Sequence, residues 1–319
     1  MPLLSVIIPV YNESGNIGSL VQAVQHALVS VDYELLVVDD GSTDNTVAEA
    51  LAALPANGRV IALATNYGQS TALRAGIEAA AGKYIAILDG DGQNDPQDLP
   101  TMLQQLQRSG ADMISGNRKK RKDAWLLRKL PSQFGNFLVR WASLVRIPDF
   151  GCSIRVMKQS VARDLRLYGH MHRYIPALAA ANGADIISTP VQHHPRLQGK
   201  SNYGLERVGE VLRDLPLLAA LSTRIPGHRE KRIGTRLVLL VIPAILFGIA
   251  LPFTRHHPAT YSLLKYILIG WLLLYAVLGT LFLIAGARAL NRHQLRAAES
   301  IYRTREVHTK ENSGENSAV

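Results

Sequence analysis

Short apolar runs and segments with helical spacing alternate along the first 115 residues. Five apolar runs have the length and composition of buried strands, at 3–10, 34–38, 60–63, 84–88 and 113–115. Between them, apolar residues recur every three or four positions at 16–29, 45–54, 70–81 and 99–109, which predicts helices. Regular strand–helix alternation is typical of an open, mostly parallel sheet with helices on both faces. The pattern therefore predicts an α/β domain.

Polar residues gather directly after each predicted strand. They are Tyr11, Asn12 and Glu13 after the first strand, Asp39 and Asp40 after the second, Asn66, Tyr67 and Gln69 after the third, Asp89, Asp91 and Gln93 after the fourth, and Asn117 and Arg118 after the fifth. In open α/β sheets, ligands bind beyond the carboxyl ends of the strands. A glycine-rich phosphate loop or dinucleotide fingerprint is absent from the sequence, which gives no support to a standard nucleotide hydrolase or an NAD enzyme.

The fourth strand ends in two carboxylates one residue apart, Asp89 and Asp91, with glycines on both sides of the second. Alternate residues at an extended strand end point the same way, so these two side chains can share one ion. Oxygen ligands of this kind suit Mg²⁺ or Mn²⁺, with phosphate oxygens completing the shell. The alternative is an ordinary turn rich in Asp, Asn and Gly.

Beyond the α/β pattern, apolar and basic residues are interleaved. Tryptophans, phenylalanines and leucines recur at near-helical spacing over about 123–146, behind a basic run at 119–122, and a second amphipathic stretch covers about 204–222. Amphipathic basic helices with tryptophan are typical of segments that lie at a membrane surface. The alternative is a pair of ordinary packed helices with snorkelling arginines.

Two further runs are apolar enough to cross a bilayer, at about 237–254 and 263–287. Their outer flanks carry clusters of arginine, whereas the loop between them carries Arg255, His256 and His257. The positive-inside rule then predicts two spans in the cell membrane, with the N-terminal domain and both termini cytoplasmic. A buried core hairpin is the alternative. We therefore predict three regions: a domain at 1–225, a membrane hairpin at 226–290, and a tail at 291–319 that is polar and disordered from Glu306 onward.

The net charge of +10 and the pI of about 9.8 suit a nucleic acid, an anionic membrane or a phosphorylated substrate. Aromatic residues make up only 6% of the chain, which argues against base stacking, so we expect no nucleic-acid partner. Cys152 is the single cysteine, which excludes an internal disulfide and a multi-cysteine zinc site. We expect it to be a small packed residue.

The segments 9–13, 38–44 and 89–93 resemble, in order and spacing, the inverting glycosyltransferases of family 2, which have an A-type, Rossmann-like fold. The later segments 116–118, 128–132, 149–155 and 194–204 resemble the branch of that family that acts on polyprenyl phosphates. That branch includes dolichyl-phosphate mannose synthase and bacterial undecaprenyl-phosphate glycosyltransferases. One departure is Gly90, where many relatives have alanine, and we expect it to loosen the turn. The signature of processive polysaccharide synthases is absent from the sequence.

The resemblance implies roles for the matching residues. The residues that match donor-binding positions are Pro9, Tyr11, Glu13, Asp39, Asp40 and Gln69. Those that match ligands of the divalent ion, Mg²⁺ or Mn²⁺, are Asp89, Asp91 and Gln93. Those that match positions binding the acceptor phosphate are Arg118, Arg128, Ser132, Arg196, Lys200 and Ser201. Asp91, Arg118 and Arg128 are the predicted catalytic residues.

The implied reaction moves a sugar from a UDP or GDP donor to an undecaprenyl or dolichyl phosphate at the cytoplasmic membrane face, for cell-envelope glycans. A phosphate is already ionised, so it needs positioning more than a base, and we assign Asp149 a positioning role, with Arg155 as a candidate partner. Two alternatives stay open: a glycolipid synthase that uses a diacylglycerol or ceramide hydroxyl, with Asp149 as its base, and a non-catalytic membrane scaffold. The spans could also pair in a homo-oligomer.

Overall fold

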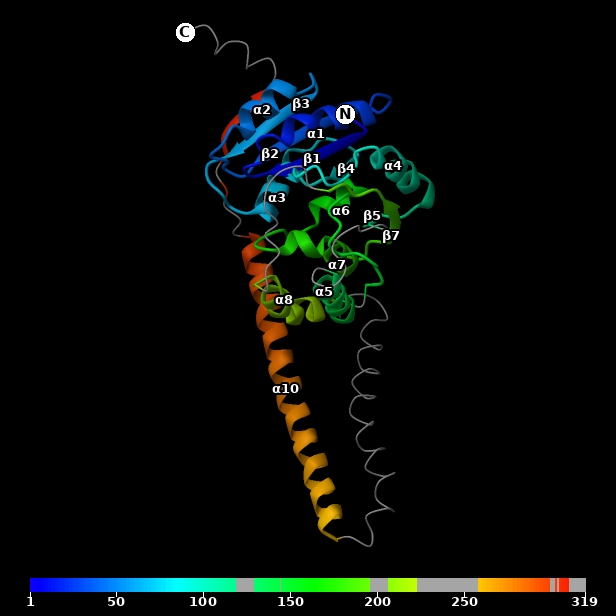
Figure 1. The fold of residues 1–319 in the computed structure, drawn as a ribbon, viewed down its shortest axis with the longest axis vertical. Helices are drawn as coiled ribbons and strands as arrows, with labels where there is room; N and C mark the ends of the chain where they lie inside the picture. The colour runs from blue at the N-terminus through cyan, green and yellow to red at the C-terminus, as the bar shows by residue number, and fades with distance from the viewer. Residues whose placement is uncertain are drawn as a thin grey trace.

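The structure is a computed structural model of the chain. It describes residues 1–118, 129–143, 145–195, 206–222, 258–298, 302 and 304–309. These form a sheet flanked by helices, from which one long helix extends (Figure 1).

The centre of the domain is an eight-stranded sheet in the order β7-β5-β6-β4-β1-β2-β3-β8. All five strands expected in the first 115 residues are present, and β6, β7 and β8 join them. The bounds are β1 Leu4–Val10, β2 Tyr33–Asp39, β3 Gly58–Leu63, β4 Tyr84–Ile87, β5 Met113–Arg118, β6 Arg155–Lys158, β7 Ile186–Val191 and β8 Thr304–Thr309. The mostly parallel α/β sheet is therefore confirmed.

Strand β6 separates β4 from β5. It runs antiparallel to both, with Arg155 opposite Ile87 of β4 and opposite Ser115 of β5. Because β4 and β5 are both antiparallel to β6, they run in the same direction and their carboxyl ends lie at one edge of the sheet. Residues that follow β4, those that follow β5, and those that precede β6 are therefore neighbours.

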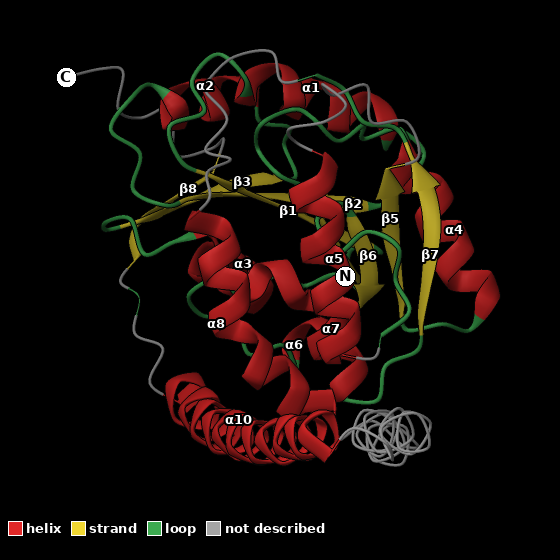
Figure 2. Ribbon diagram, turned by 60° about the horizontal axis from the view of Figure 1, so that its bottom comes forward, coloured by secondary structure: helices red, strands yellow, loops and turns green. Residues whose placement is uncertain are grey.

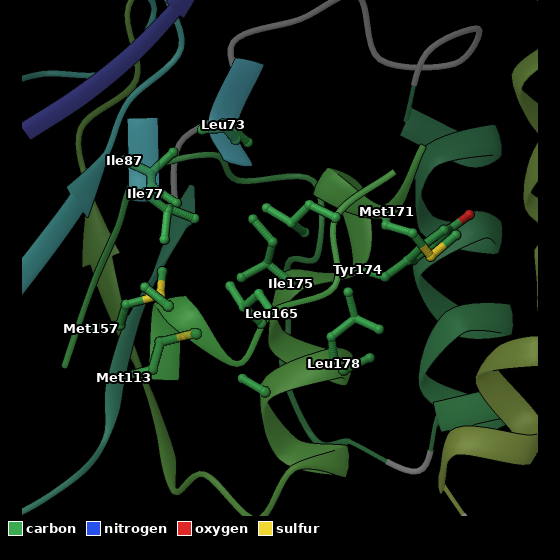
Figure 3. Packing of buried hydrophobic residues seen from close by; sticks show 14 of the residues in the cluster. Leu73, Ile77, Ile87, Met113, Met157, Leu165, Met171, Tyr174, Ile175 and Leu178 are labelled. Atoms are coloured by element: carbon green, nitrogen blue, oxygen red, sulfur yellow. The ribbon is translucent and has the colours of Figure 1, made fainter. Parts of the chain in front are cut away.

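Helices cover both faces of the sheet (Figure 2). Helices α1 (Ile17–Ala27), α2 (Thr46–Ala53) and α4 (Asp98–Ser109) bury apolar residues in one cluster with Leu4, Val6 and Ile8 of β1. Helices α3 (Gln69–Ala79), α5 (Lys129–Ser143), α6 (Gln159–Arg163), α7 (Ile175–Ala181) and α8 (Glu206–Leu221), with the 3₁₀ turn Met171–Tyr174, pack on the other face. Figure 3 shows part of that second cluster, in which Met113 and Met157 of the sheet face Leu165 and Ile175. Alternate residues of each strand thus serve opposite faces.

Helix α10, Pro258–Ala298, is the long helix that leaves the domain. Its 41 residues correspond to about 60 Å at 1.5 Å per residue, twice the apolar thickness of a bilayer. Ile269–Arg292 is long and apolar enough to cross a membrane, and only 6% of its most apolar window is buried. Exposed apolar residues along its length contradict the alternative of a buried core hairpin for this helix. The other expected span, 237–254, lies outside the described residues.

Helices α5 and α8 lie at the root of α10. Gly286 of α10 lies against α8, because an added Cβ would be 3.0 Å from the Pro216 carbonyl oxygen, and the rings of Trp141 and Phe282 meet edge to face with centroids 6.5 Å apart. Both helices fall within the amphipathic stretches expected at 123–146 and 204–222. Phe137 and Trp141 of α5 remain 54% and 44% exposed beside the apolar surface of α10. Their position at a membrane surface stays a prediction.

The tail differs from the expectation of disorder from Glu306 onward. Residues Thr304–Thr309 form β8, which pairs antiparallel with β3, and the Tyr302 hydroxyl donates a hydrogen bond to Glu78 of α3. An edge strand is held by main-chain hydrogen bonds to one neighbouring strand, so it does not need an apolar sequence pattern. The polar composition of this segment therefore gave no indication of a strand. The segment after α10 therefore joins the same sheet as the N-terminal strands.

Ending the chain after Ala298 should destabilise the domain and promote association. The truncation removes the Tyr302 hydrogen bond and leaves the β3 edge unpaired, a template for contact with another chain. We expect the melting temperature in detergent to fall by roughly 4 °C, as a loss of 1–2 kcal/mol implies, with aggregates in size-exclusion chromatography. Ending the chain after Thr309 keeps β8 and is the control. Equal melting curves for the two truncations would contradict a stabilising role for β8.

Candidate active site

The loops after β1 and β2 are tied together at the carboxyl edge of the sheet. The Asn12 amide donates to Ser42 Oγ at 2.9 Å, and Asn12 Oδ1 accepts from the Thr43 amide at 2.9 Å. Asn12 has a positive φ of 52°, a conformation that asparagine tolerates better than most residues. Buried Asp39 accepts from the Ser42 amide, and the Glu13 amide donates to Thr46 Oγ1.

The predicted donor residues of these two loops therefore lie together. Pro9 is opposite Val38 in the β1–β2 pairing, and the Tyr11 ring that follows is exposed. These two loops thus bring the Asp39 carboxylate and an exposed aromatic ring to the place where a nucleoside is expected.

Asp40 serves the protein's own backbone. Its carboxylate oxygens accept from the amides of Tyr67 and Gly68, both at 2.8 Å. Burial raises the pKa of Asp40 above its usual range, an effect that these two hydrogen bonds oppose. Asp40 therefore fixes the turn that leads into α3, which favours a supporting role over direct contact with a donor.

Gly41 is required by space and by conformation. Its φ is +76°, and an added Cβ would lie 2.5 Å from the Thr65 carbonyl carbon. A side chain would push apart the loops after β2 and β3. The close approach brings Asp39 and Asp40 near the start of α3.

Asp89 is held at the end of β4 by two neutral donors. Gln69 Nε2 donates to Asp89 Oδ1 at 2.7 Å from the first turn of α3, and the Ser153 hydroxyl donates from the segment before β6. Gln69, expected at the donor, thus contacts a predicted metal ligand. Burial, and then the neighbouring charge of Asp91, raise the pKa of Asp89.

The residues of this acidic turn suit a divalent cation. Asp91 is only 9% exposed, and its Oδ1 accepts from the Gln93 amide at 3.2 Å. A bound cation would offset the burial and the Asp91 charge that oppose ionisation of Asp89, and carboxylate oxygens are ligands that Mg²⁺ and Mn²⁺ prefer. Across the described part of the chain, no cluster of three or more His, Cys, Asp or Glu side chains could hold a metal. The turn therefore fits an ion whose shell is completed by a ligand's oxygens.

Gly90 lets the acidic turn pack closely against β1. An added Cβ would lie 2.6 Å from Val10 Cγ1 and 3.1 Å from the Pro9 carbonyl oxygen. We expected this glycine to loosen the turn; the close contact indicates instead that it brings the turn nearer to the predicted donor residues.

Arg118 and Asp149 form a two-point ion pair at the end of β5. Arg118 Nε lies 2.6 Å from Asp149 Oδ2, and Nη2 lies 2.8 Å from Oδ1. Both side chains are largely buried, and the Gly151 amide also donates to Asp149 Oδ1 at 3.0 Å. The expected positioning role of Asp149 thus has a hydrogen-bonded partner, Arg118. Gly151 permits the pair, because an added Cβ would lie 2.7 Å from Arg118 Nη2.

The sequence did not reveal the role of Ser153, which lies just before β6, whereas Arg155, the first residue of β6, was expected as a candidate partner of Asp149. Ser153 bridges Asp89 and Asn94, and Arg155 is a buried cation between β4 and β5. Cys152 is fully buried, and burial raises the pKa of its thiol to about 11, which confirms a packed, unreactive cysteine.

Several predicted acceptor residues are not placed. Arg128, Arg196, Lys200 and Ser201 lie outside the described residues, and only the backbone of Ser132 is described, in α5. Just before 196, the His194 amide donates to the Gln93 carbonyl oxygen at 2.8 Å, and His194 Nε2 lies 3.0 Å from Asp95 Oδ2. The segment with the predicted phosphate-binding loop therefore begins beside the acidic turn.

Solved structures share this fold. Glucosyl-3-phosphoglycerate synthase from Mycobacterium tuberculosis, in complex with Mn²⁺, UDP and glucosyl-3-phosphoglycerate, superposes with a TM-score of 0.52 and 18% identity, over 70% of this chain and 81% of that one. At this identity the likeness shows the fold alone, an α/β sheet of the A type.

Sequence comparison is more specific. Dodecaprenyl-phosphate galacturonate synthase from Rhizobium johnstonii is 39% identical over 254 residues, which cover 76% of this chain and 75% of that protein. Undecaprenyl-phosphate 4-deoxy-4-formamido-L-arabinose transferase from Aeromonas hydrophila is 33% identical over 77% of this chain and 78% of its own length. The family described as glycosyl transferase family 2 matches residues 5–180, which include Asp39, the acidic pair Asp89 and Asp91, and the ion pair of Arg118 and Asp149. The chain belongs to glycosyl transferase family 2.

Proposed function

We propose that this protein transfers a sugar from a nucleotide diphosphate sugar to a polyprenyl phosphate, with inversion at the anomeric carbon. The observation that carries the proposal is the placement of two opposite kinds of charge at one sheet edge. The acidic pair Asp89 and Asp91 follows β4, and the buried guanidinium of Arg118 ends β5, with β6 between them. The relatives are named as a dodecaprenyl-phosphate galacturonate synthase and an undecaprenyl-phosphate 4-deoxy-4-formamido-L-arabinose transferase, which supports this acceptor class.

In this proposal the acidic side serves the donor. Asp39 accepts a hydrogen bond from the base, Tyr11 and Pro9 line the nucleoside site, and Asp89, Asp91 and Gln93 would hold Mg²⁺ or Mn²⁺. The ion's chemistry there is charge neutralisation on the leaving diphosphate. Asp40 and Gln69 support the site from behind, through the Tyr67–Gly68 amides and through Asp89.

The basic side serves the acceptor. A polyprenyl phosphate is a nucleophile at neutral pH, so it needs charge screening and alignment rather than deprotonation. Asp149 aligns the Arg118 guanidinium, and arginine matches a phosphate in a way that lysine does not. Arg128, Ser132, Arg196, Lys200 and Ser201 complete the predicted acceptor site.

The tail supports a topology with two spans. Because β8 pairs with β3, the end of α10 lies on the same side of the membrane as the catalytic domain. A chain that leaves and returns to one side crosses the membrane an even number of times. With α10 as one crossing, the apolar run at 237–254 is the other, and the catalytic domain and both termini are cytoplasmic by the positive-inside rule.

A hydroxyl acceptor is disfavoured by the surroundings of Asp149. A diacylglycerol or ceramide hydroxyl requires a general base. Asp149 is the candidate base for such an acceptor, and both its oxygens accept hydrogen bonds from Arg118. Its lone pairs are thus directed at a cation and not toward a substrate proton.

The test is a donor and acceptor panel with membranes that contain the protein. We expect undecaprenyl phosphate and Mn²⁺ or Mg²⁺ to give a glycosylated lipid that is labile to mild acid, identified by mass spectrometry. The donors are UDP- and GDP-sugars, led by UDP-galacturonate and UDP-4-deoxy-4-formamido-L-arabinose. Membranes with the Asp91→Ala variant are the control. Glycosylated diacylglycerol with no polyprenyl product would overturn the acceptor class, and no product from any donor would favour a scaffold.

A further inference from the structure

One segment, Asp149–Arg155, contacts both halves of the proposed site. Asp149 at its start pairs with Arg118 of β5, whereas Ser153 near its end bonds to Asp89 after β4. The strand register explains this reach. Arg155 lies opposite Ile87 on one side and Ser115 on the other, so the residues just before Arg155 run between the ends of β4 and β5.

Ser153 is the contact on the metal side. Its hydroxyl accepts from Asn94 Nδ2 at 2.7 Å and donates to the Asp89 carboxylate. Asn94 is buried, and it follows Gln93 in the acidic turn. The hydroxyl therefore ties the first and last parts of the turn to the segment before β6. Together with Gln69, it fixes the direction in which Asp89 presents its oxygens.

Arg155 is the residue that holds the segment in shape. It is 3% exposed, and its Nη2 and Nη1 donate to the carbonyl oxygens of Phe150 and Ser153 at 3.1 and 3.3 Å. Its positive charge acts on Asp89 and on Asp149, and burial lowers its pKa. Among the residues that the structure describes, its buried Nε has no hydrogen-bond partner. A buried guanidinium with an unsatisfied N–H opposes folding, so the neighbouring carboxylates are the compensation that keeps it there.

We propose that Ser153 and Arg155 are positioning residues that couple the donor–metal half of the site to the acceptor half. Ser153 orients Asp89 toward the ion, and Arg155 fixes the backbone that carries Ser153 and Asp149, and so Arg118. Neither residue needs to touch a substrate. The inference rests on the proposed function, since it assigns both residues to the ion and acceptor sites described there.

Ser153→Ala tests the metal side, and the chain supplies a matched control. Ser5 is buried at the amino end of β1, far from the site, and its hydroxyl likewise donates to a carboxylate, Glu34, and accepts from an N–H, that of Gly82. Calorimetry would measure how the affinity for UDP or GDP, whichever the wild-type protein binds, depends on Mn²⁺. We expect Ser153→Ala to weaken Mn²⁺-dependent nucleotide binding about tenfold, as losing an outer-shell partner of a metal ligand does. Ser5→Ala should change it less than twofold.

Arg155→Lys tests the coupling. Lysine keeps the charge but cannot span both carbonyl oxygens. We expect this variant to raise both the Mn²⁺ requirement of nucleotide binding and the KM for undecaprenyl phosphate, each by roughly tenfold, whereas Ser153→Ala affects chiefly the first. Lys158→Met, in the same strand and paired with Asp112, is its control.

The outcomes separate the two proposals. If the nucleotide affinity of the wild-type protein does not depend on Mn²⁺, or if the wild-type protein does not use undecaprenyl phosphate as an acceptor, the proposed function is wrong. If the wild-type protein behaves as proposed but Ser153→Ala matches Ser5→Ala, the positioning role is wrong and the proposed function stands. Should Arg155→Lys fail to fold, the Ser153→Ala comparison decides on its own.

Discussion

Replacing Asp91 by alanine should abolish sugar transfer, with kcat reduced by about 10³-fold or more, the size of effect seen when a main electrostatic contact to the transition state is removed. Asp91 is 9% exposed at the end of β4, where its charge adds to the burial that raises the pKa of Asp89. Removing it relieves Asp89 of a like charge and leaves one carboxylate where the ion needs two. The ion's affinity and the stabilisation of the leaving diphosphate are therefore lost together.

The measurement is nucleotide binding and turnover as functions of Mn²⁺ concentration. Asp112→Ala is a matched control, because Asp112 is also an acid whose carboxylate bonds to the protein, to Lys158 and to the Asp185 amide, but at the start of β5. It should cost some stability and leave the Mn²⁺ dependence unchanged. If Asp91→Ala keeps the wild-type Mn²⁺ dependence, Asp91 does not belong to the ion site.

The sheet and the gathering of polar residues could be predicted because both follow from local patterns. Runs such as 3–10 and 34–38 are almost entirely apolar, as strands buried on both faces are. The carboxyl ends of parallel strands share an edge, so Asp39 and Asp89 could be placed near each other from the strands alone.

The insertion of β6 could not be predicted in the same way. Its four residues are too few to show a period, and pairing between β4 and β5 depends on contacts far apart in the chain. The contact of Ser153 with Asp89 depends on that pairing, and the contact of Gln69 with Asp89 depends on the turn that Asp40 fixes. Spacing along the chain therefore indicated neither contact. Arg155 in the apolar run 154–157 was the available hint, because an arginine that becomes buried there needs a carboxylate partner, and Asp149 was the expected one.

Strand β8 shows a different limit. Among residues Thr304–Thr309 only Val307 is apolar, and a polar terminal stretch of this kind is more often disordered. Its order depends on the free edge of β3, which is a property of the assembled sheet. Composition alone therefore predicted disorder for residues that the folded sheet orders.

Asp149→Asn should lower kcat/KM for undecaprenyl phosphate by about 10²-fold while Mn²⁺-dependent nucleotide binding stays within twofold. Asparagine keeps the shape but weakens the two charge-assisted bonds to Arg118, so the guanidinium loses its alignment. Arg118→Lys should have a similar effect, because lysine cannot bind the phosphate and Asp149 in the same geometry. Since the two residues act as one unit, the double variant should lose little more than either single variant.

The pH profile separates this positioning role from general base catalysis. If the nucleophile is the phosphate dianion, kcat/KM should fall as the pH drops through about 6, the second ionisation of a phosphate monoester. That acid limb belongs to the acceptor and should persist in Asp149→Asn at a lower plateau. If Asp149 were the base, its loss would remove the limb together with nearly all of the activity, and a hydroxyl acceptor would then be the better account. If the acid limb persists and the double variant shows that Arg118 and Asp149 act together, the role of Asp149 is to position Arg118. The acid limb then reports the ionisation of the acceptor phosphate itself.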